Sequence, residues 1–322
     1  MKAVVIDKVT PAEDISLVEV PIPEVIPGWV LVKIKAFGLN YSEKLLRISR
    51  INHKSIKKPL IPGTECAGLI IDPSDSDFKK GDKVIAFMGG MGRQYDGSYA
   101  EYALLPADHV FHVESDLEWP EIAAVPKTYF TAMGALFGSL KIKPEDTLLI
   151  RGATCAMGYV ALQIAKTVGC RVIAATQREE KFGFLEGADV VIPDDGRITG
   201  KVFGANKAID LIGPKSLMDT LTAVEKEGIV CCTALIGGVY SIEDFNPLKD
   251  IPNGVYLTGF DSDNPTQKDV DDIFVFLDQN NLSPSVGAVY DFTNIREALM
   301  DLDAVKTNGK IVVMMDDYGW GI

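Results

Sequence analysis

The chain has 322 residues, of which 47% are apolar, and its formal net charge is −13. This length exceeds one ordinary domain, so we expect two domains with large buried cores. The negative charge argues against broad binding to nucleic acid or to anionic membranes, which needs a basic face, and no apolar run reaches the roughly 18 residues of a membrane span.

Residues 1 to about 115 are predicted to be mainly β-structure. The N-terminal segment "MKAVVIDKV" is interrupted by Asp7 and Lys8, so we interpret it as a first strand and not as a signal peptide. Short apolar runs alternate with turn residues throughout this region, which is typical of strands. The runs are "KAVVI", "WVLVKIKAFG", "AGLII", "DKVIAF", "SYAEYALL" and "VFHV".

The pattern changes near residue 116. "WPEIAAV", with Pro120 at a favourable first helical position, predicts a helix, and "TAMGALFGSL" predicts another. From about 147 to 260, apolar strands alternate with amphipathic helices, which indicates a parallel sheet covered on both faces. The tail, 265–322, predicts two helices and a final strand, "GKIVVMM".

Cysteine and histidine usage gives no sign of a zinc finger or a disulfide framework. None of the five cysteines forms a C-x-x-C pair, and the chain has three histidines. We therefore expect a cytoplasmic protein with reduced, mostly buried thiols.

The stretch "LLIRGATCAMGYVALQIAK", residues 148–166, has the order strand, glycine turn, helix. Gly152 would allow the backbone to approach a pyrophosphate, and Gly158 would allow close contact between helix and strand. The middle glycine of the usual G-x-G-x-x-G spacing is missing, so the motif is weak by itself. Its position at the start of a βαβ unit favours a dinucleotide site. The residues expected there are Gly152, Ala153, Thr154, Cys155, Ala156, Met157 and Gly158.

The end of the next strand, "VIAATQREEKF", indicates which dinucleotide binds. A carboxylate at this place would hold the ribose 2′-hydroxyl of NAD, but the strand ends in Thr176 and Gln177, followed by Arg178 and Lys181. A guanidinium pairs well with a 2′-phosphate, so we favour NADPH. Alternatively, the two cations belong to a solvated helix start, although a cation in the first helical turn is electrostatically unfavourable.

Nearly the whole chain resembles the medium-chain dehydrogenase/reductase superfamily, and within it the zinc-independent quinone oxidoreductase branch. The resemblance rests on the order and spacing of eight segments. They are "MKAVVI", "VLVKIKAFGLNYSE" (30–43), "PLIPGTECAGLI" (59–70), "FKKGDKVIAF" (78–87), "GSYAEYALLPADHV" (97–110), "AAVPKTYFTAMGAL" (123–136), "LLIRGATCAMGYVALQIAKTVGCRVIAAT" (148–176) and "GKIVVMM" (309–315).

This resemblance implies an α/β fold with two parts. A GroES-like, β-rich catalytic domain would be formed by residues 1–118 and 262–322. A Rossmann domain with a doubly wound parallel sheet, residues 119–261, would be inserted between these two segments and would bind NADPH. The family also implies a homodimer, for which the strand "GVYLTGF" would offer an exposed edge.

Departures from the zinc-dependent alcohol dehydrogenases imply that no metal is bound. Those enzymes have a cysteine ligand where this chain has Asn40 and a histidine ligand where it has Thr64. Glu65 alone cannot hold catalytic zinc, which needs three protein ligands. In the turn 152–158, Ala156 and Met157 replace the glycine and valine of the family pattern, which affects the expected affinity for pyrophosphate and not the fold.

The resemblance also implies roles for individual residues. Asn40 and Tyr41 would line the catalytic cleft beside the nicotinamide and hydrogen-bond a substrate carbonyl, and the alternative for Tyr41 is surface packing of the β-rich domain. Thr131 would lie near the nicotinamide ribose, or else bond to its own helix backbone. The nicotinamide half of the cofactor would also contact Leu235, Ile236, Gly237 and Phe260.

We therefore expect an enzyme that transfers hydride from NADPH to a quinone or another electron-poor, carbonyl-conjugated small molecule without zinc. Two alternatives remain open: a reductase of 2-alkenals or enones, and an NADPH-binding sensor or structural protein with little turnover. The basic stretch "LLRISRINHKSIKK", residues 45–58, is explained by a solvated rim or by attraction of an acidic substrate.

Overall fold

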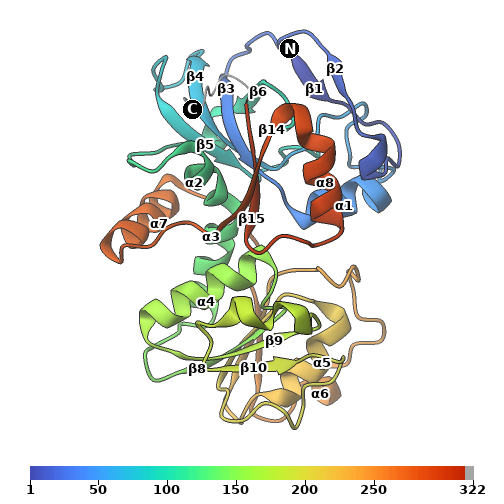
Figure 1. Cartoon of the computed structure of the whole chain (residues 1–322), viewed down its shortest axis with the longest axis vertical. Helices are drawn as coiled ribbons and strands as arrows, with labels where there is room; N and C mark the ends of the chain where they lie inside the picture. Colours follow the sequence, from blue (N-terminus) through green and yellow to red (C-terminus); the bar gives the residue numbers. More distant parts are fainter. Residues whose placement is uncertain (316–322) are drawn as a thin grey trace. The chain divides into compact units, whose positions relative to one another are not determined.

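The computed structural model describes residues 1–315, and Figure 1 shows its ribbon. The chain divides into two compact units, one formed by Met1–Phe130 with the chain from Asp263 onward, the other by Thr131–Ser262. The domain boundaries expected from sequence lie at 118/119 and 261/262. Residues 316–322 of the expected catalytic domain lie outside the described part of the chain. The first division falls later because helix α2 (Trp119–Ala124) packs against strands of the first unit.

The first unit is built on a seven-stranded sheet with the order β14-β15-β3-β4-β5-β7, in which β6 also pairs with β3. Its longest strand, β3 (Trp29–Gly38), has apolar side chains buried on both faces, so the sheet is covered on both sides. A separate antiparallel pair, β1 (Lys2–Val4) and β2 (Leu17–Glu19), lies near the N-terminus. The other strands of this part are β4 (Glu65–Asp72), β5 (Lys83–Phe87), β6 (Tyr102–Pro106) and β7 (Val110–His112).

The C-terminal part of the chain completes this sheet. Strand β15 (Lys310–Met314) pairs antiparallel with β3, and strand β14 (Val286–Asp291) pairs parallel with β15. The final strand was expected from sequence, whereas β14 was not, because its residues are at most half-buried and it contains Gly287. Helix α8 (Ile295–Asp303) packs against both strands (Figure 1), and helix α7 (Gln267–Gln279) contacts β7.

The second unit has a six-stranded parallel sheet with the order β10-β9-β8-β11-β12-β13. From β8 the chain first adds β9 and β10 on one side and then β11, β12 and β13 on the other, so the switch point lies between β8 and β11. Doubly wound sheets that bind dinucleotides have the same kind of switch point. The predicted α/β fold with a β-rich domain and a Rossmann-like sheet is therefore confirmed. The strands are β8 (Thr147–Arg151), β9 (Arg171–Thr176), β10 (Val190–Pro193), β11 (Lys207–Asp210), β12 (Ile229–Cys232) and β13 (Tyr256–Gly259).

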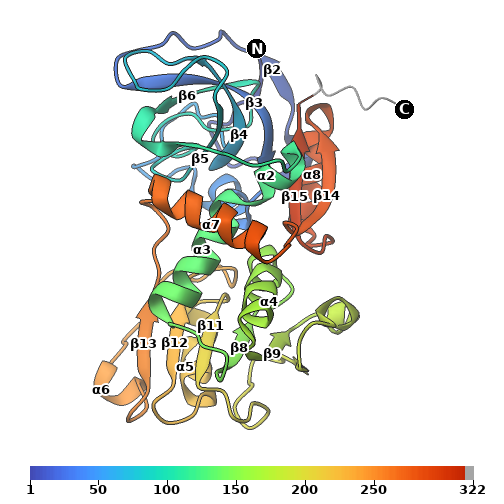
Figure 2. The ribbon, with the colours of Figure 1, turned by 90° about the vertical axis from the view of Figure 1, so that its left-hand side faces the viewer.

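Helix α4 (Ala156–Val168) packs against β8 and β9, as Figure 2 shows, and buries Val160 and Ile164. Residues 134–139, part of a predicted helix, form a π-helix after α3 (Pro126–Met133), and residues 179–185 form a 3₁₀-helix. The remaining α-helices of the described residues are α1 (Tyr41–Leu45), α5 (Pro214–Ala223) and α6 (Pro247–Asp250).

Most of the stretch 45–58 is exposed, and among its basic residues Arg47 is the buried exception. One guanidinium nitrogen of Arg47 donates to both carboxylate oxygens of Asp303 in α8. This ion pair joins distant segments of the first unit. Among the described residues, no helix has the length and apolar character that crossing a bilayer requires. The five cysteines form no disulfide, and three of them are buried.

Candidate functional site

The glycine turn after β8 (residues 152–158) lies where three loops of the parallel sheet converge. Gly152 has a φ of +86°, a conformation that favours glycine. The backbone N–H groups of Gly152 and Ala153 both donate to the Ala175 carbonyl at 3.0 Å, which ties the turn to the end of β9. A Cβ on Gly152 would approach Ile212, after β11, and Ile236, after β12, at 3.2 Å. The turn therefore sits at the switch point of the sheet.

The first turn of α4 is shaped for close backbone approach. A Cβ on Gly158 would lie 2.4 Å from the Ala153 carbonyl oxygen, so glycine is required for the helix to meet the turn. Cys155 caps the helix, with its Sγ accepting from the Gly158 N–H at 3.3 Å, and burial raises the pKa of its thiol, which keeps it uncharged. Ala156 begins the helix and is not among the residues with positive φ, so its extra methyl causes no backbone strain. Met157 follows it, half-buried.

The end of β9 is joined to the glycine turn through two hydroxyls. Thr154 Oγ1 and Thr176 Oγ1 are 2.7 Å apart, and the Arg178 backbone N–H donates to Thr176 Oγ1 at 3.2 Å. The Arg178 guanidinium is half-buried and lies 3.7 Å from Glu180 Oε1, which is too long for a strong pair. Lys181 is buried, and the loss of water lowers its pKa.

Gln177, between Thr176 and Arg178, is exposed. Residues 176–181 thus bring together a hydroxyl, an amide and two cations, and Thr176 joins this segment to the turn.

The other residues expected at the nicotinamide half lie in the loops after β12 and β13 and on α3. Leu235, Ile236 and Gly237 are half-buried, and the backbone N–H of Gly237 donates to the Ile212 carbonyl at 2.9 Å. The Phe260 ring lies against Gly134, where a Cβ would meet the ring at 2.0 Å. Thr131 is buried on α3.

In the first unit, a buried polar cluster surrounds Glu65, which we call the Glu65 cluster (Asn40, Thr64, Glu65, Thr128 and Lys310). The Asn40 side-chain amide donates to Glu65 Oε1 at 2.7 Å and faces Thr64 Oγ1 at 3.3 Å. Lys310 of β15, only 2% exposed, pairs with Glu65 and donates to Asn40 Oδ1 at 2.8 Å and to Thr128 Oγ1 at 2.9 Å. Every heteroatom of the Asn40 side chain is therefore already engaged within the protein.

Asn40 is also joined to Glu43 by the cap of helix α1. The Asn40 backbone N–H donates to Glu43 Oε2 at 2.8 Å, and that carboxylate also accepts from the buried Tyr99 hydroxyl at 2.6 Å. Tyr41, the first helical residue, is half-buried, and the Lys44 ammonium lies 5.3 Å from its ring centroid. The cap thus fixes Asn40 and Tyr41 on one rigid turn at the edge of the Glu65 cluster.

The cluster does not fit a catalytic zinc ion. The sequence positions that hold two zinc ligands in zinc-dependent relatives carry Asn40 and Thr64, and the carboxylate of Glu65 is paired with the Lys310 ammonium. Within residues 1–315, no group of three or more histidine, cysteine, aspartate and glutamate side chains could hold a metal ion. These donors are unsuitable for zinc, which needs three protein ligands in a catalytic site.

Sequence reasoning did not single out Lys127, which belongs to the same region. Its backbone N–H donates to Glu65 Oε2 at 2.8 Å, and its ammonium donates to Ser42 Oγ, also at 2.8 Å. Ser42 directly follows Tyr41, so Lys127 connects the Glu65 cluster to helix α1. The sequence around this lysine, "AAVPKTYF", contains no pattern that would identify it, because its partners lie 62 and 85 residues away.

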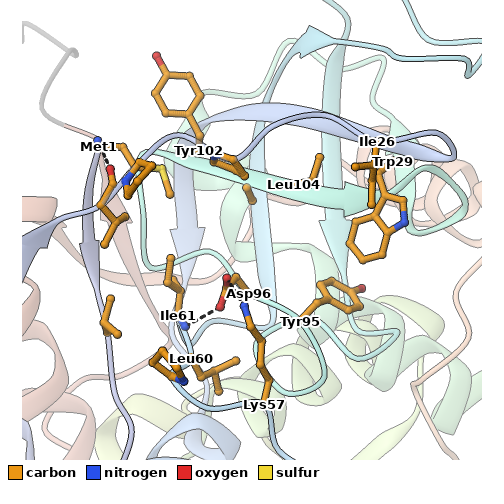
Figure 3. Close-up of a pocket in the computed structure, with 16 residues that line it drawn as sticks. Met1, Ile26, Trp29, Lys57, Leu60, Ile61, Tyr95, Asp96, Tyr102 and Leu104 are labelled. Atoms are coloured by element: carbon orange, nitrogen blue, oxygen red, sulfur yellow. Dashed lines mark hydrogen bonds and ion pairs between the residues drawn. The ribbon is translucent and has the colours of Figure 1, made fainter.

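A pocket of about 450 Å³ opens elsewhere in the first unit and is shown in Figure 3. Its walls are mainly apolar and include Trp29 and Tyr95, with the Lys57–Asp96 ion pair at one side. Asp96 also accepts from the Ile61 backbone N–H at 3.0 Å. None of the residues expected at the cofactor or at catalysis lines this pocket, so this pocket is not the candidate site.

Comparison with known proteins places these features in a family context. A family model described as "Alcohol dehydrogenase GroES-like domain" matches residues 26–115, and one described as "Zinc-binding dehydrogenase" matches residues 186–313. The chain is 27% identical over 317 residues to the quinone oxidoreductase of Sus scrofa, covering 93% of this chain and 92% of that protein.

Two further similarities extend this context. The Bacillus subtilis protein YhfP, which carries a quinone oxidoreductase name, is 30% identical over 244 residues, covering 72% of this chain and 73% of that protein. Among solved structures, the yhdH oxidoreductase of Salmonella enterica in complex with NADP has a TM-score of 0.83 at 22% identity, covering 98% of this chain and 99% of that one.

Proposed function

The chain belongs to the quinone oxidoreductase branch of the medium-chain dehydrogenase/reductase superfamily and is an oxidoreductase, and from this premise we propose that it transfers hydride from NADPH to a quinone or another electron-poor, carbonyl-conjugated small molecule. The premise rests on the matches to quinone oxidoreductases over most of the chain.

The glycine turn at the switch point of the parallel sheet carries the proposal. Gly152 has a φ of +86°, and a Cβ on it would crowd Ile212 and Ile236, so the backbone of this turn keeps its conformation only with glycine. The start of the 13-residue helix α4, with its partial positive charge, favours a pyrophosphate. Residues 152–158 would hold the pyrophosphate, and residues 235–237, Thr131 and Phe260 would surround the nicotinamide half.

The preference for NADPH over NADH is supported by the charges at the end of β9. Arg178 and Lys181 follow Thr176 there, and the end of the strand itself bears no carboxylate. Glu180 is the nearest carboxylate to Arg178, but its 3.7 Å separation leaves the guanidinium available to a stronger anionic partner such as a 2′-phosphate.

The reduced nicotinamide would supply a hydride, and the residues of the first unit would bind and polarise the acceptor. Asn40 and Tyr41 are fixed on one helix cap, which suits a role in orienting a substrate carbonyl. The Asn40 amide already donates to Glu65, so our candidate for the hydrogen bond to substrate is the Tyr41 hydroxyl.

The decisive experiment is an NADPH-oxidation screen of the purified protein with ortho-quinones, para-quinones, 2-alkenals and enones. We expect turnover with at least one of these classes, without added metal and with no zinc found by elemental analysis. Tight NADPH binding without oxidation across the whole panel would contradict the enzymatic proposal and would favour a cofactor-binding sensor or structural protein.

A further inference from the structure

Lys127 places an ammonium group at the outer edge of the Glu65 cluster. Its Nζ donates to Ser42 Oγ at 2.8 Å, and its backbone N–H is held by Glu65 Oε2 at the same distance. Lys127 is half-buried and Ser42 is exposed, so this pair lies where the buried cluster reaches the surface of the unit. Ser42 follows Tyr41 directly, which puts Lys127 beside the residues expected to meet the substrate.

The second lysine of the region has a different position. Lys310 is 2% exposed and its ammonium is engaged by Glu65, Asn40 and Thr128. It therefore compensates the buried Glu65 charge from the inside, where no substrate can reach it. Because Lys310 already balances Glu65, the Lys127 ammonium is a second positive charge of the region, and it is hydrogen-bonded to the exposed Ser42.

Four charged side chains, Glu43, Glu65, Lys310 and Arg93, act electrostatically on the Lys127 ammonium. Removal of water lowers the pKa of Lys127, and the positive charges of Lys310 and Arg93 act in the same direction, while the carboxylates of Glu43 and Glu65 oppose the change. A lysine with a depressed pKa is closer to the operating pH, which is the property that a proton donor needs.

We propose that Lys127 is the catalytic acid of this protein: its ammonium, steered by Ser42, donates a hydrogen bond and then a proton to the substrate oxygen on which negative charge develops. This inference rests on the proposed function for the identity of the reaction and names the group that completes it. It departs from metal-assisted polarisation, since an ammonium and not a Lewis acid would meet the oxygen.

The electron-poor carbon of the substrate accepts a hydride, with its two electrons, from reduced nicotinamide. The substrate π pair moves to the carbonyl oxygen, an N–H bond of Lys127 breaks, and an O–H bond forms. The neutral amine then regains a proton from water. In total the substrate gains two electrons and two protons, and the cofactor is oxidised by two electrons.

The first test measures Lys127 directly in the cofactor-free protein. Competitive labelling with acetic anhydride at a series of pH values, quantified by mass spectrometry, gives the pH at which each amine becomes reactive. We expect Lys127 to become reactive at lower pH than the internal reference Lys268, an exposed lysine whose pKa is raised by its bond to Asp272. Coincident titration of Lys127 and Lys268, or a later one for Lys127, would overturn the assignment.

The second test measures oxyanion binding, again without cofactor, with para-nitrophenolate as the probe and its absorbance as the signal. We expect Lys127→Met to weaken binding about tenfold or more, which is the loss of one charge-assisted hydrogen bond, and Lys127→Arg to bind as the wild type does. Lys166→Met, which removes a lysine paired with Asp189 in the other unit, serves as the matched control. Equal binding by wild type and Lys127→Met, or no binding by the wild type, would refute the proposal.

Turnover completes the test once a substrate is known. An acid must be protonated to act, so kcat of the wild type should fall as pH rises through the pKa found by labelling, and this limb should disappear in Lys127→Met. A limb that persists in Lys127→Met and disappears in Tyr41→Phe would overturn the assignment in favour of Tyr41. If no quinone or enone is reduced while the phenolate still binds through Lys127, the proposed function fails and the oxyanion site stands.

Discussion

At the scale of single residues, the first unit depends on how the charge of Glu65 is compensated. Glu65 is fully buried, and its carboxylate accepts from the Asn40 amide, the Lys127 backbone and the Lys310 ammonium. A buried carboxylate that loses its cation is left with an uncompensated charge in a medium of low polarity. The Lys310–Glu65 pair therefore links β15 to β4, and removing one partner should lower the stability of the unit strongly.

We predict that Lys310→Met lowers the free energy of unfolding by about 3–5 kcal/mol, as is typical for removing one partner of a buried ion pair. Urea denaturation measures the change. The double variant Lys310→Met/Glu65→Gln serves as the control, because it removes the orphaned charge and should recover a large part of the loss. Equal stability of the single and double variants would show that the charge of Glu65 is not the cause.

Cofactor preference is also decided by single residues. We predict that Arg178→Ala raises the dissociation constant of NADPH about tenfold or more and leaves that of NADH nearly unchanged, because only NADPH has the 2′-phosphate that a guanidinium would bind. Fluorescence titration with both cofactors measures the two constants. Equal effects on both would exclude the 2′-phosphate contact and would leave the ribose to Glu180 or to backbone groups.

At the scale of elements, helix α4 and strand β8 are joined through the glycine turn. Gly158 lies in the first turn of the helix, where a Cβ would be 2.4 Å from the Ala153 carbonyl oxygen. Any residue other than glycine would therefore push the helix away from the turn. The turn positions the start of α4, and the start of α4 is what would face the pyrophosphate.

We predict that Gly158→Ala displaces α4 from the turn, lowers stability by about 1–3 kcal/mol as overpacking does and weakens dinucleotide binding. Gly183→Ala is the matched control, since a Cβ there meets nothing within 4 Å and its φ is not positive. Thermal unfolding and a binding titration measure both quantities. Unchanged binding by Gly158→Ala would argue against the turn as the pyrophosphate site.

At the scale of the whole molecule, the parallel sheet ends at an edge strand. Strand β13 pairs with β12 on one side and is the last strand in the order of its sheet, and Tyr256 on it is 58% exposed. An open edge with an exposed aromatic side chain invites pairing with a second copy, which is the basis on which we propose a homodimer.

We predict that the wild type sediments as a dimer and that Tyr256→Lys shifts it toward monomer, because a charged side chain on an edge strand disfavours pairing. Light scattering with size-exclusion chromatography gives the mass. Phe203→Lys, a second exposed aromatic in the same unit but not on β13, is the control. A monomeric wild type would contradict the proposal.

The sequence by itself determined the features that depend on local order. Alternating strands and helices, a glycine turn between β8 and α4, and the segments shared with a known family predict the fold class and the candidate cofactor residues, because periodicity and turn chemistry are properties of neighbours in the chain. The fold class is confirmed, and the roles of the cofactor residues remain predictions.

Only the tertiary structure decided how distant residues meet. Strand β14 has no strong pattern of its own and forms because β15 offers it an edge. Lys310 reaches Asn40 across 270 residues, and Lys127 reaches Ser42 across 85, so neither contact leaves a trace in local sequence. The physical reason is that burial and charge compensation act between surfaces that the chain brings together only on folding.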